Sequence, residues 1–341
     1  MAPVATYRVT LQPSGHSFET DGSESVLQAA LDAGLTLPYG CRNGACGACK
    51  GKVLEGLVDH GQAQDTALPT ADRAAGMTLF CCARPLSDLV LEVREVGTAR
   101  DIPVKILPCR VQQLERVADD VIVMSLKLPV NERLQFLAGQ YIEFLLKDGK
   151  RRAFSIANAP HDDGFLQLHI RHVPGGEFTG HVFGAMKEKD ILRFQGPYGG
   201  FFLREESTKP MILVAGGTGF APIKSLVEHA IHHGIKRPME LYWGSRDRAG
   251  LYHPELPQAW AREHAHIRYV PVLSDATPAD AWTGRTGFVH RAVLEDHPDL
   301  SAWQVYACGA PVMIDAARTD FAAAGMPAEE FFADSFTFAA G

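Results

Sequence analysis

The spacing of hydrophobic and polar residues changes along the chain and predicts regions of different architecture. The first region opens with alternating residues over 7–11, which predict a strand, and continues with a helical pattern over 25–31 that Gly34 closes. It ends on a second strand over 89–93. Between 97 and 108 the helical periodicity is lost and two prolines appear, so this stretch suits a connection between domains.

The rest of the chain shows two further patterns. Short alternating strands are expected over 121–126, 141–145 and 165–170, and Gly, Pro and Asp clusters separate them, as in an antiparallel barrel. From Pro210 onward strands alternate with helices, which implies βαβ units on a parallel sheet. The expected strands and helices of this last region are 211–215, 223–233, 239–243, 267–272, 305–308 and 312–324.

Composition and charge argue against several classes of protein. The 341 residues are 46% hydrophobic, which suits two or three domains with buried cores. A net charge of −7, without a run of basic residues, disfavours nucleic-acid binding. Apolar runs such as 211–215 are too short to span a membrane, and residues 1–5 lack a secretory signal pattern. We therefore expect a cytoplasmic protein with no nucleic-acid or membrane partner, and a monomer is the starting expectation.

Five of the seven cysteines lie in the first quarter of the chain: Cys41, Cys46, Cys49, Cys81 and Cys82. The first three have the C-x4-C-x2-C spacing of a plant-type [2Fe-2S] cluster, which needs a fourth thiolate downstream. Both Cys81 and Cys82 are candidates on spacing alone. A structural zinc site is the alternative, but zinc sites usually pair two C-x2-C knuckles and only one is present.

Two segments around these cysteines resemble the plant-type ferredoxin domain. They are 38–47 and 81–88, which read PYGCRNGACG and CCARPLSD. The resemblance implies a β-grasp fold and makes Cys81 the fourth ligand, with Cys82 as a packing neighbour. As a separate hypothesis, we expect the acceptor to dock on the face around Arg42 and Lys50, near the most exposed edge of the cluster. The metal ligands expected from the resemblance are Cys41, Cys46, Cys49 and Cys81.

A second motif points to flavin. A cluster carries one electron whereas a nicotinamide gives up two as hydride, so a chain that uses both needs a converter. Residues 152–155 resemble the R-x-[YF]-[ST] motif of the ferredoxin–NADP reductase superfamily. The resemblance implies that Arg152 binds the flavin pyrophosphate, Phe154 packs on the isoalloxazine ring and Ser155 bonds near its N5. Without other support, a surface charge and a core aromatic would be the preferred explanation of Arg152 and Phe154.

The segment 169–179 supports the flavin assignment. In the superfamily a Gly-rich turn followed by Ser or Thr at a helix start binds the pyrophosphate, so Thr179 is expected to be both N-cap and phosphate ligand. The order of the domains, ferredoxin first, resembles reductases that use FAD. The other flavin candidates are Ala153, His169, Ile170, Arg171, Gly175, Gly176 and Phe178.

A third set of motifs predicts a nicotinamide site. Residues 216–222 follow a strand, precede a helix and resemble the superfamily's G-G-T-G-x-A-P motif rather than the G-x-G-x-x-G fingerprint. Residues 306–311 resemble its C-G-x-P turn, which implies that Cys308 lies beside the nicotinamide ring, although a small buried residue is the alternative. Phe336 resembles an aromatic lid over the flavin. The candidates from these motifs are Gly216, Gly217, Thr218, Gly219, Pro222, Cys308 and Gly309.

The choice of NADH or NADPH depends on residues 244–248, which follow the second expected strand of the last region. An acidic side chain there favours NADH, whereas an arginine can pair with the 2′-phosphate of NADPH. This segment contains Arg246, Asp247 and Arg248. Arg246 is the candidate ligand, solvated charges are an equally good explanation, and the donor stays open.

The resemblance covers essentially the whole chain and implies a multi-domain protein of the α+β and α/β classes. The domains are a β-grasp ferredoxin domain over 1–97, a linker over 98–107, an antiparallel flavin-binding β-barrel over 108–206 and a parallel-sheet nucleotide-binding domain over 207–341.

The implied function is an oxidoreductase that passes electrons from NADH or NADPH through FAD to a [2Fe-2S] cluster and on to a terminal oxygenase, such as a ring-hydroxylating dioxygenase. The first alternative is the reductase of a CDP-6-deoxy-sugar 3-dehydrase, and the second is a flavin and iron–sulfur redox sensor. A zinc-containing nucleotide-binding protein is the third. The residues expected at the reacting atoms are Ser155, Cys308 and Phe336.

Overall fold

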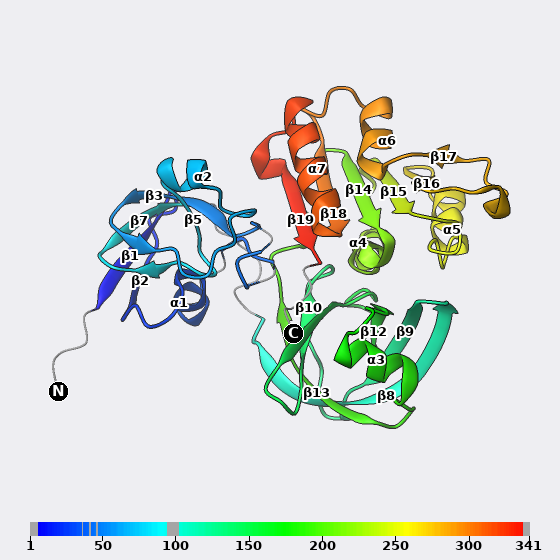
Figure 1. Ribbon diagram of the computed structural model, residues 1–341, viewed down its shortest axis with the longest axis horizontal. Coiled ribbons are helices and arrows are strands. Elements are labelled where there is room, and N and C mark those ends of the chain that lie inside the picture. The colour runs from blue at the N-terminus through cyan, green and yellow to red at the C-terminus, as the bar shows by residue number, and fades with distance from the viewer. Residues whose placement is uncertain (1–5, 36, 41, 46, 94–101, 337–341) are drawn as a thin grey trace. The chain divides into compact units, whose positions relative to one another are not determined.

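The computed structural model describes residues 6–35, 37–40, 42–45, 47–93 and 102–336. By contacts the chain forms two compact units, one of residues 1–102 with 199–201 and one of residues 103–198 with 202–341. Figure 1 shows both, and each is described by itself below. Within the described residues, no helix is both long and apolar enough to span a bilayer.

The N-terminal unit is a mixed five-stranded sheet, ordered β2-β1-β7-β3-β5, with helix α1 (Val26–Asp32) beside it. The hydroxyl of Ser25 accepts a hydrogen bond from the Gln28 amide and begins the helix, and Gly34, at φ +75°, follows its end. The predicted ferredoxin-type architecture is confirmed. The remaining elements are β1 (Tyr7–Gln12), β2 (Ser17–Thr20), β3 (Lys50–Glu55), β4 (Val58–Asp59), α2 (Thr70–Ala74), β5 (Met77–Leu79), β6 (Arg84–Pro85) and β7 (Leu89–Glu92).

The C-terminal unit begins with an antiparallel six-stranded sheet, ordered β11-β10-β13-β8-β9-β12. Buried alternate residues of these strands form one core with helix α3 (Glu177–Gly184). The predicted barrel strands are confirmed, whereas the long β8 was not predicted and begins inside the predicted linker 98–107. The domain borders themselves stay predictions. The strands are β8 (Lys105–Ala118), β9 (Val121–Lys127), β10 (Tyr141–Leu145), β11 (Arg151–Ser155), β12 (Leu166–Arg171) and β13 (Ile191–Tyr198).

The rest of this unit is a parallel six-stranded sheet, ordered β17-β16-β15-β14-β18-β19. The central strand β14 pairs with β15 on one side and β18 on the other, so the strand order reverses there and a ligand crevice is expected at the carboxyl ends of these strands. Helices α6 and α7 pack on one face of the sheet, and Figure 1 shows them next to each other. This parallel architecture was predicted correctly.

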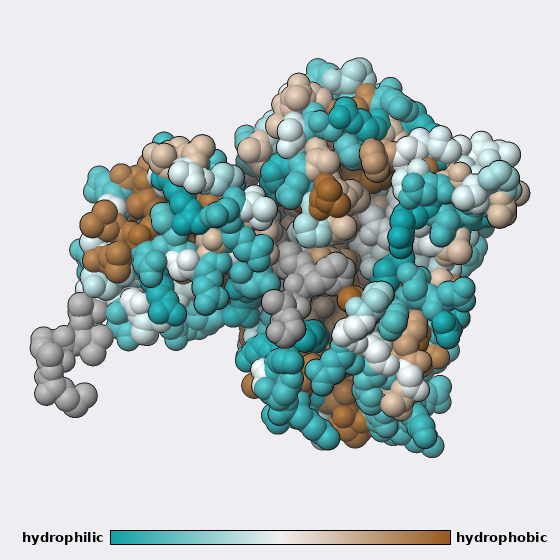
Figure 2. Space-filling view, in the orientation of Figure 1, coloured by the Kyte–Doolittle hydropathy of each residue, from teal (hydrophilic) through white to brown (hydrophobic). Residues whose placement is uncertain are grey.

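The elements of this sheet follow each other in the expected alternation, although α5, α6 and β19 had no predicted counterpart. The hydrophilic colours that dominate the visible surface in Figure 2 agree with an interior that holds most of the apolar side chains. The elements are β14 (Met211–Gly216), η1 (Gly217–Gly219), α4 (Phe220–His232), β15 (Met239–Ser245), α5 (Glu255–Glu263), β16 (Ile267–Leu273), η2 (Pro278–Asp280), β17 (Arg285–Thr286), α6 (Val289–Asp296), β18 (Gln304–Gly309), α7 (Pro311–Ala323), η3 (Ala328–Glu330) and β19 (Phe331–Ser335).

Candidate cofactor and electron-transfer sites

The glycine loop that joins β14 to α4 packs directly against the end of β18. A Cβ atom on Gly219 would lie 2.0 Å from the carbonyl oxygen of Cys308, so only glycine permits this contact. Gly217 has φ +53°, and a Cβ atom there would lie 3.3 Å from the guanidinium of Arg171. Its glycines therefore let neighbouring groups approach the backbone closely at the start of α4, as a phosphate cradle requires.

Buried aromatic residues pack next to this loop and support it. Phe220 stacks on Trp243 with ring centroids 3.9 Å apart, and both side chains are fully buried. The indole Nε1 of Trp243 donates a hydrogen bond of 3.0 Å to the carbonyl of Gly217. Trp243 was not predicted as a site residue, because its only signal in the sequence is a tryptophan inside a predicted strand.

Arg171 brings one unsatisfied guanidinium nitrogen to the same loop. One guanidinium nitrogen pairs with Asp120 at 2.5 Å, whereas Nη2 is buried and has no hydrogen-bond partner in the part of the chain that the structure describes. Buried donors are nearly always satisfied. A dinucleotide pyrophosphate would supply the missing acceptor, so the residues present fit that group.

His169 lies on β12, two residues before Arg171, and its side chain is enclosed by the aromatic residues that pack next to the glycine loop. Its Nδ1 lies 2.9 Å from the hydroxyl of Tyr252, and its Nε2 is buried without a partner among the described residues. Burial lowers the pKa of His169 well below its usual value, and Lys224 and His253 add to this effect. Ile170, between the two, lies in the barrel core. His169 therefore remains neutral, and its contacts support the loop.

Cys308 lies in the middle of the parallel sheet, at the carboxyl end of β18. It is fully buried and pairs in register with Ala215 on one side and Asp334 on the other. Burial, and secondarily Asp334, raises the pKa of the Cys308 thiol well above its usual value. The thiol is therefore protonated at neutral pH and is not a nucleophile.

Ser155 connects the barrel to this part of the parallel sheet. Its hydroxyl donates a 3.3 Å hydrogen bond to the carboxylate of Asp334, and both residues are buried. The amide of Phe336 donates to the carbonyl of Gly309 at 2.9 Å, so this residue, directly after β19, is held next to the Cys308 turn. The structure thus brings the three predicted residues Ser155, Cys308 and Phe336 to neighbouring elements.

The flavin motif on β11 divides between two faces of the strand. Arg152 and Phe154 are half-buried on one face, whereas Ala153 is exposed on the other. Phe154 packs against Phe178 with ring centroids 5.5 Å apart, and Phe178 is buried in the barrel core. The side chain of Arg152 donates to the carbonyl of Arg151. Arg152 and Phe154 are therefore partly accessible from solvent, and their flavin roles stay predictions.

One expectation about the pyrophosphate turn is wrong. Gly176, not Thr179, is the N-cap of α3, because helical geometry already begins at Glu177. The Thr179 hydroxyl instead accepts a 3.1 Å hydrogen bond from the amide of Val173 and so fixes the preceding turn. Gly175, in that turn, has φ +75°, a conformation that favours glycine.

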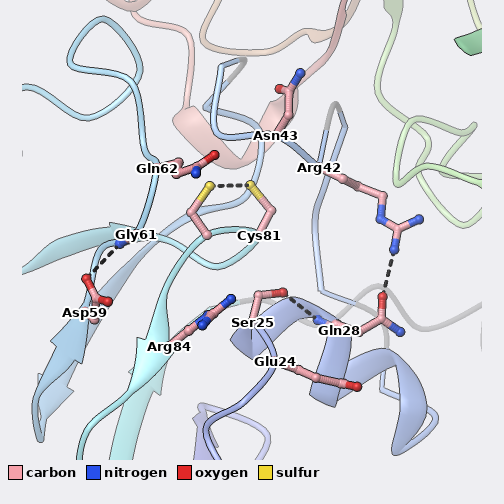
Figure 3. A pocket seen from close by; sticks show the side chains of 11 residues that line it. Glu24, Ser25, Gln28, Arg42, Asn43, Asp59, Gly61, Gln62, Cys81 and Arg84 are labelled. Atoms are coloured by element: carbon pink, nitrogen blue, oxygen red, sulfur yellow. Dashed lines mark hydrogen bonds between the residues drawn. The ribbon is translucent and has the colours of Figure 1, made fainter. Parts of the chain in front are cut away.

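Two of the described cysteines of the N-terminal unit, Cys81 and Cys82, line a pocket of about 730 Å³. Cys41 and Cys46 lie outside the described residues. Cys49 is buried, and its sulfur accepts a hydrogen bond of 3.5 Å from the amide of Cys81, the kind of N–H···S contact that a cluster's sulfurs require. The sulfurs of Cys81 and Cys82 are 3.7 Å apart. Figure 3 shows Cys81 inside the pocket.

Further contacts define the surroundings of these cysteines. A Cβ atom on Gly44 would lie 2.6 Å from the sulfur of Cys82, so this thiol packs directly against the cluster loop. Arg42 lines the pocket and donates to Gln28 at 2.7 Å (Figure 3). Lys50 forms an ion pair of 2.6 Å with Asp72. Both predicted docking residues are therefore already engaged within their own unit.

The two arginines after β15 differ in their contacts. The guanidinium of Arg248 donates to the carbonyl of Asp280 at 3.2 Å, and its amide bonds the carboxylate of the same residue. Asp247 caps its own turn by accepting from the amide of Gly250. Arg246 is exposed. Arg246 is therefore the better candidate of the two to bind the 2′-phosphate of NADPH, because the guanidinium of Arg248 is already bonded to Asp280.

Three family models match the chain and together span most of it. A 2Fe-2S iron-sulfur cluster binding domain matches residues 9–86, an oxidoreductase FAD-binding domain matches 108–203, and an oxidoreductase NAD-binding domain matches 213–319. Their order and extent agree with the three predicted cofactor sites.

Similar proteins match along nearly their whole length. A CDP-6-deoxy-L-threo-D-glycero-4-hexulose-3-dehydrase reductase from Yersinia pseudotuberculosis is 44% identical over 96% of this chain and 98% of its own. The reductase component 1 of terephthalate 1,2-dioxygenase from Comamonas is 35% identical over 97% of each chain. Among solved structures, the Amycolatopsis reductase GcoB has a TM-score of 0.77 at 35% identity and covers 97% of this chain and 98% of its own.

Proposed function

Since the chain belongs to the iron–sulfur flavoprotein reductases, which join 2Fe-2S, FAD-binding and NAD-binding domains, we propose a route for its electrons. The route runs from NADH or NADPH to FAD, then to the [2Fe-2S] cluster and finally to a separate acceptor protein. FAD, when bound, converts the two-electron hydride into single electrons that a cluster can carry. The protein's own residues have to hold and orient the cofactors, because no acid or base need act.

The observation that carries this proposal is Nη2 of Arg171, which is buried beside the glycine loop and has no hydrogen-bond partner among the described residues. We propose that Arg171 and the backbone of residues 216–219 hold the dinucleotide pyrophosphate, with Thr218, Pro222 and Gly309 shaping the cradle. Cys308, as a neutral buried thiol, would pack beside the nicotinamide ring without reacting.

The contact between Ser155 and Asp334 suggests how the flavin end is arranged. The Ser155 hydroxyl now donates to Asp334, and the same proton can turn to a flavin nitrogen when the ring is present. Phe154 and Phe336 would enclose the ring, and Arg152, with the turn at 175–179, would hold the flavin pyrophosphate. The four cluster ligands are proposed to be Cys41, Cys46, Cys49 and Cys81.

We propose a terminal oxygenase as the acceptor, since several relatives are oxygenase reductases by name. They include the terephthalate 1,2-dioxygenase reductase and a phenol 2-monooxygenase reductase that is 37% identical to this chain. A CDP-6-deoxy-hexulose 3-dehydrase is the second candidate, favoured by the higher identity of 44% to its reductase. Fold alone does not choose between acceptors.

The proposed setting is a monomer in the cytoplasm. One chain contains all three cofactor domains, so no second copy is needed to complete the route. The described cysteines are free thiols, which suits a reducing compartment.

The first test is the visible spectrum of the purified protein under argon, before and after one equivalent of NADH or, separately, NADPH. Flavin and iron–sulfur bands that bleach with one nucleotide are the expected result, and they also identify the donor. Flavin absorbance without a cluster band would contradict the metal assignment. A colourless protein would overturn the whole proposal.

The second test supplies the reduced protein with a purified oxygenase or with a CDP-6-deoxy-hexulose dehydrase and follows the product of each. Turnover by one of them assigns the acceptor. Rapid reduction of artificial acceptors with neither partner active would reject both acceptors, and slow reduction throughout would favour the redox sensor.

A further inference from the structure

A group of potential metal ligands lies at the far end of α4, away from the glycine loop. Glu205, His229 and His233 each offer one ligand atom, and these atoms all lie within 4.8 Å of one another. The Nε2 of His229 is 2.9 Å from a carboxylate oxygen of Glu205, and the rings of the two histidines have centroids 4.2 Å apart. All three residues belong to the C-terminal unit.

The local structure explains why these side chains meet. His229 lies in the last turn of α4 and His233 directly follows the helix, four residues later, so both rings project from the same side. Glu205 comes from the segment between β13 and β14, which passes this helix end. The helix C-terminus carries a partial negative charge, which favours a cation there.

The distances suit a first-row transition metal. Zinc binds histidine nitrogen and carboxylate oxygen at about 2.0–2.2 Å in a tetrahedron, which separates two ligand atoms by about 3.4 Å. The His229–Glu205 separation of 2.9 Å is shorter than that value, and all three ligand atoms lie within 4.8 Å of one another, so side-chain rotations could bring them to zinc distances. His229 is itself buried, and its Nδ1 has no partner among the described residues, so only Glu205 anchors the ring.

We propose that Glu205, His229 and His233 form a binding site for a zinc-class divalent cation, with water as the fourth ligand. The site is separate from the cluster cysteines and from the glycine loop. It would join two parts of the C-terminal unit, because Glu205 lies on the connection from the barrel to the parallel sheet. Helix α4, which carries His229, already contacts the barrel, since Ser225 of this helix donates to the carbonyl of Asn158 at 2.8 Å.

The competing explanation is an ordinary ion pair between Glu205 and His229. Neighbouring histidines offer a matched control, because His232 stacks on His161 at 3.7 Å and neither belongs to the ligand group. Removing one of these rings changes the histidine content of the same surface but leaves the three ligands intact.

The experiment uses the full-length protein with its flavin and cluster, after mild chelator treatment and desalting. Calorimetric titration with Zn²⁺ should show one site that Mg²⁺ does not occupy. The variants His233→Ala and Glu205→Gln, both at exposed positions, should weaken zinc binding by more than about tenfold. The control His232→Ala should bind zinc within about twofold of the unchanged protein. Equal affinity in all variants would overturn the proposal.

A second measurement needs no substitution. X-ray absorption at the zinc edge of the loaded protein should show only nitrogen and oxygen neighbours, with histidine signatures. Sulfur neighbours would place the zinc on cysteines and reject the site. Thermal unfolding should show a zinc-dependent rise in melting temperature that His233→Ala removes and His232→Ala retains, as binding to the native state requires.

Discussion

Cys308 in the C-terminal unit and Cys81 in the N-terminal unit are both placed at proposed electron-transfer sites, but in opposite surroundings. Cys308 is fully buried between two strands, and its thiol is kept protonated by burial. Cys81 lines a pocket beside a second thiol and is half-buried. The comparison shows that a cysteine's role follows from its accessibility and its neighbours, since a cluster ligand must reach the metal as a thiolate.

The two sites also differ in what holds them together. The nucleotide loop is fixed by packing, since Gly219 touches the Cys308 carbonyl and Trp243 bonds Gly217. At the cluster site, the described contacts between cysteines are one N–H···S bond and one S···S contact. The described contacts of the first site are thus made by the protein alone, whereas the proposed cluster site would be completed by thiolates bound to a metal.

The largest effect is expected at the cluster site. Cys81→Ser should abolish the cluster absorbance and electron transfer to the acceptor protein, because a fourth thiolate is lost. Reduction of ferricyanide by the nicotinamide donor should stay within about twofold, since that reaction stops at the flavin. Visible spectra and the two assays measure both effects.

Cys82→Ser is the matched control, because the two sulfurs are only 3.7 Å apart. It should keep both the cluster and acceptor reduction. If Cys82→Ser removes the cluster and Cys81→Ser does not, the fourth ligand is Cys82. Loss of ferricyanide reduction in Cys81→Ser would contradict the separation of the two sites.

The next effect concerns the packed loop. Gly219→Ala places a Cβ atom 2.0 Å from a backbone oxygen, so the strand or the loop must move. We expect a loss of about 3 kcal/mol or more in the free energy of unfolding, together with weaker nucleotide binding. Denaturant unfolding and nucleotide titration measure these changes.

Gly164→Ala serves as the comparison, since nothing lies within 4 Å of a Cβ atom there. Its unfolding free energy should stay within about 0.5 kcal/mol of the unchanged protein. Similar losses in both variants would mean that the close approach to Cys308 does not determine the loop.

The residues of these sites also show which functional positions could be predicted from the sequence. Gly219 and Cys308 were both predicted as site residues, because each lies in a short motif whose neighbours are adjacent in the chain. Trp243, Tyr252 and Asp120 were not, because their roles arise from contacts between elements that are distant in sequence.

The error at Thr179 has a similar origin. A helix start depends on where the backbone first becomes helical, and Gly176 with its extended conformation takes that position. The broad architecture was predictable, since hydrophobic periodicity distinguishes an antiparallel barrel from alternating strands and helices. The side-chain contacts of the proposed cofactor-binding residues could not be predicted in this way.

A smaller effect is expected from His169, the neutral histidine next to the glycine loop. The pKa of His169 is well below 6.5 in the folded protein and returns to about 6.5 on unfolding, so the unfolded state binds more protons below that pH. Stability should therefore fall as the pH drops below about 6.5, by up to about 1.4 kcal/mol per pH unit from this group.

His169→Gln should remove that share of the acid sensitivity, because glutamine does not titrate but can still bond Tyr252. Unfolding curves of both proteins between pH 7.5 and about 5 measure the difference in slope. Parallel pH dependences would show that His169 can be protonated within the folded state.

The smallest effect is expected at the proposed nucleotide site's exposed residue Arg246. Arg246→Ala should raise the KM for NADPH by about fivefold, because an exposed guanidinium paired with a 2′-phosphate contributes about 1 kcal/mol or less. The KM for NADH should change less, since NADH has no such phosphate. Arg248→Ala is the control, as its guanidinium is already bonded to Asp280. A larger effect on NADPH in Arg248→Ala than in Arg246→Ala would assign the phosphate contact to the other arginine, and would mean that a guanidinium held by Asp280 can still turn to a ligand.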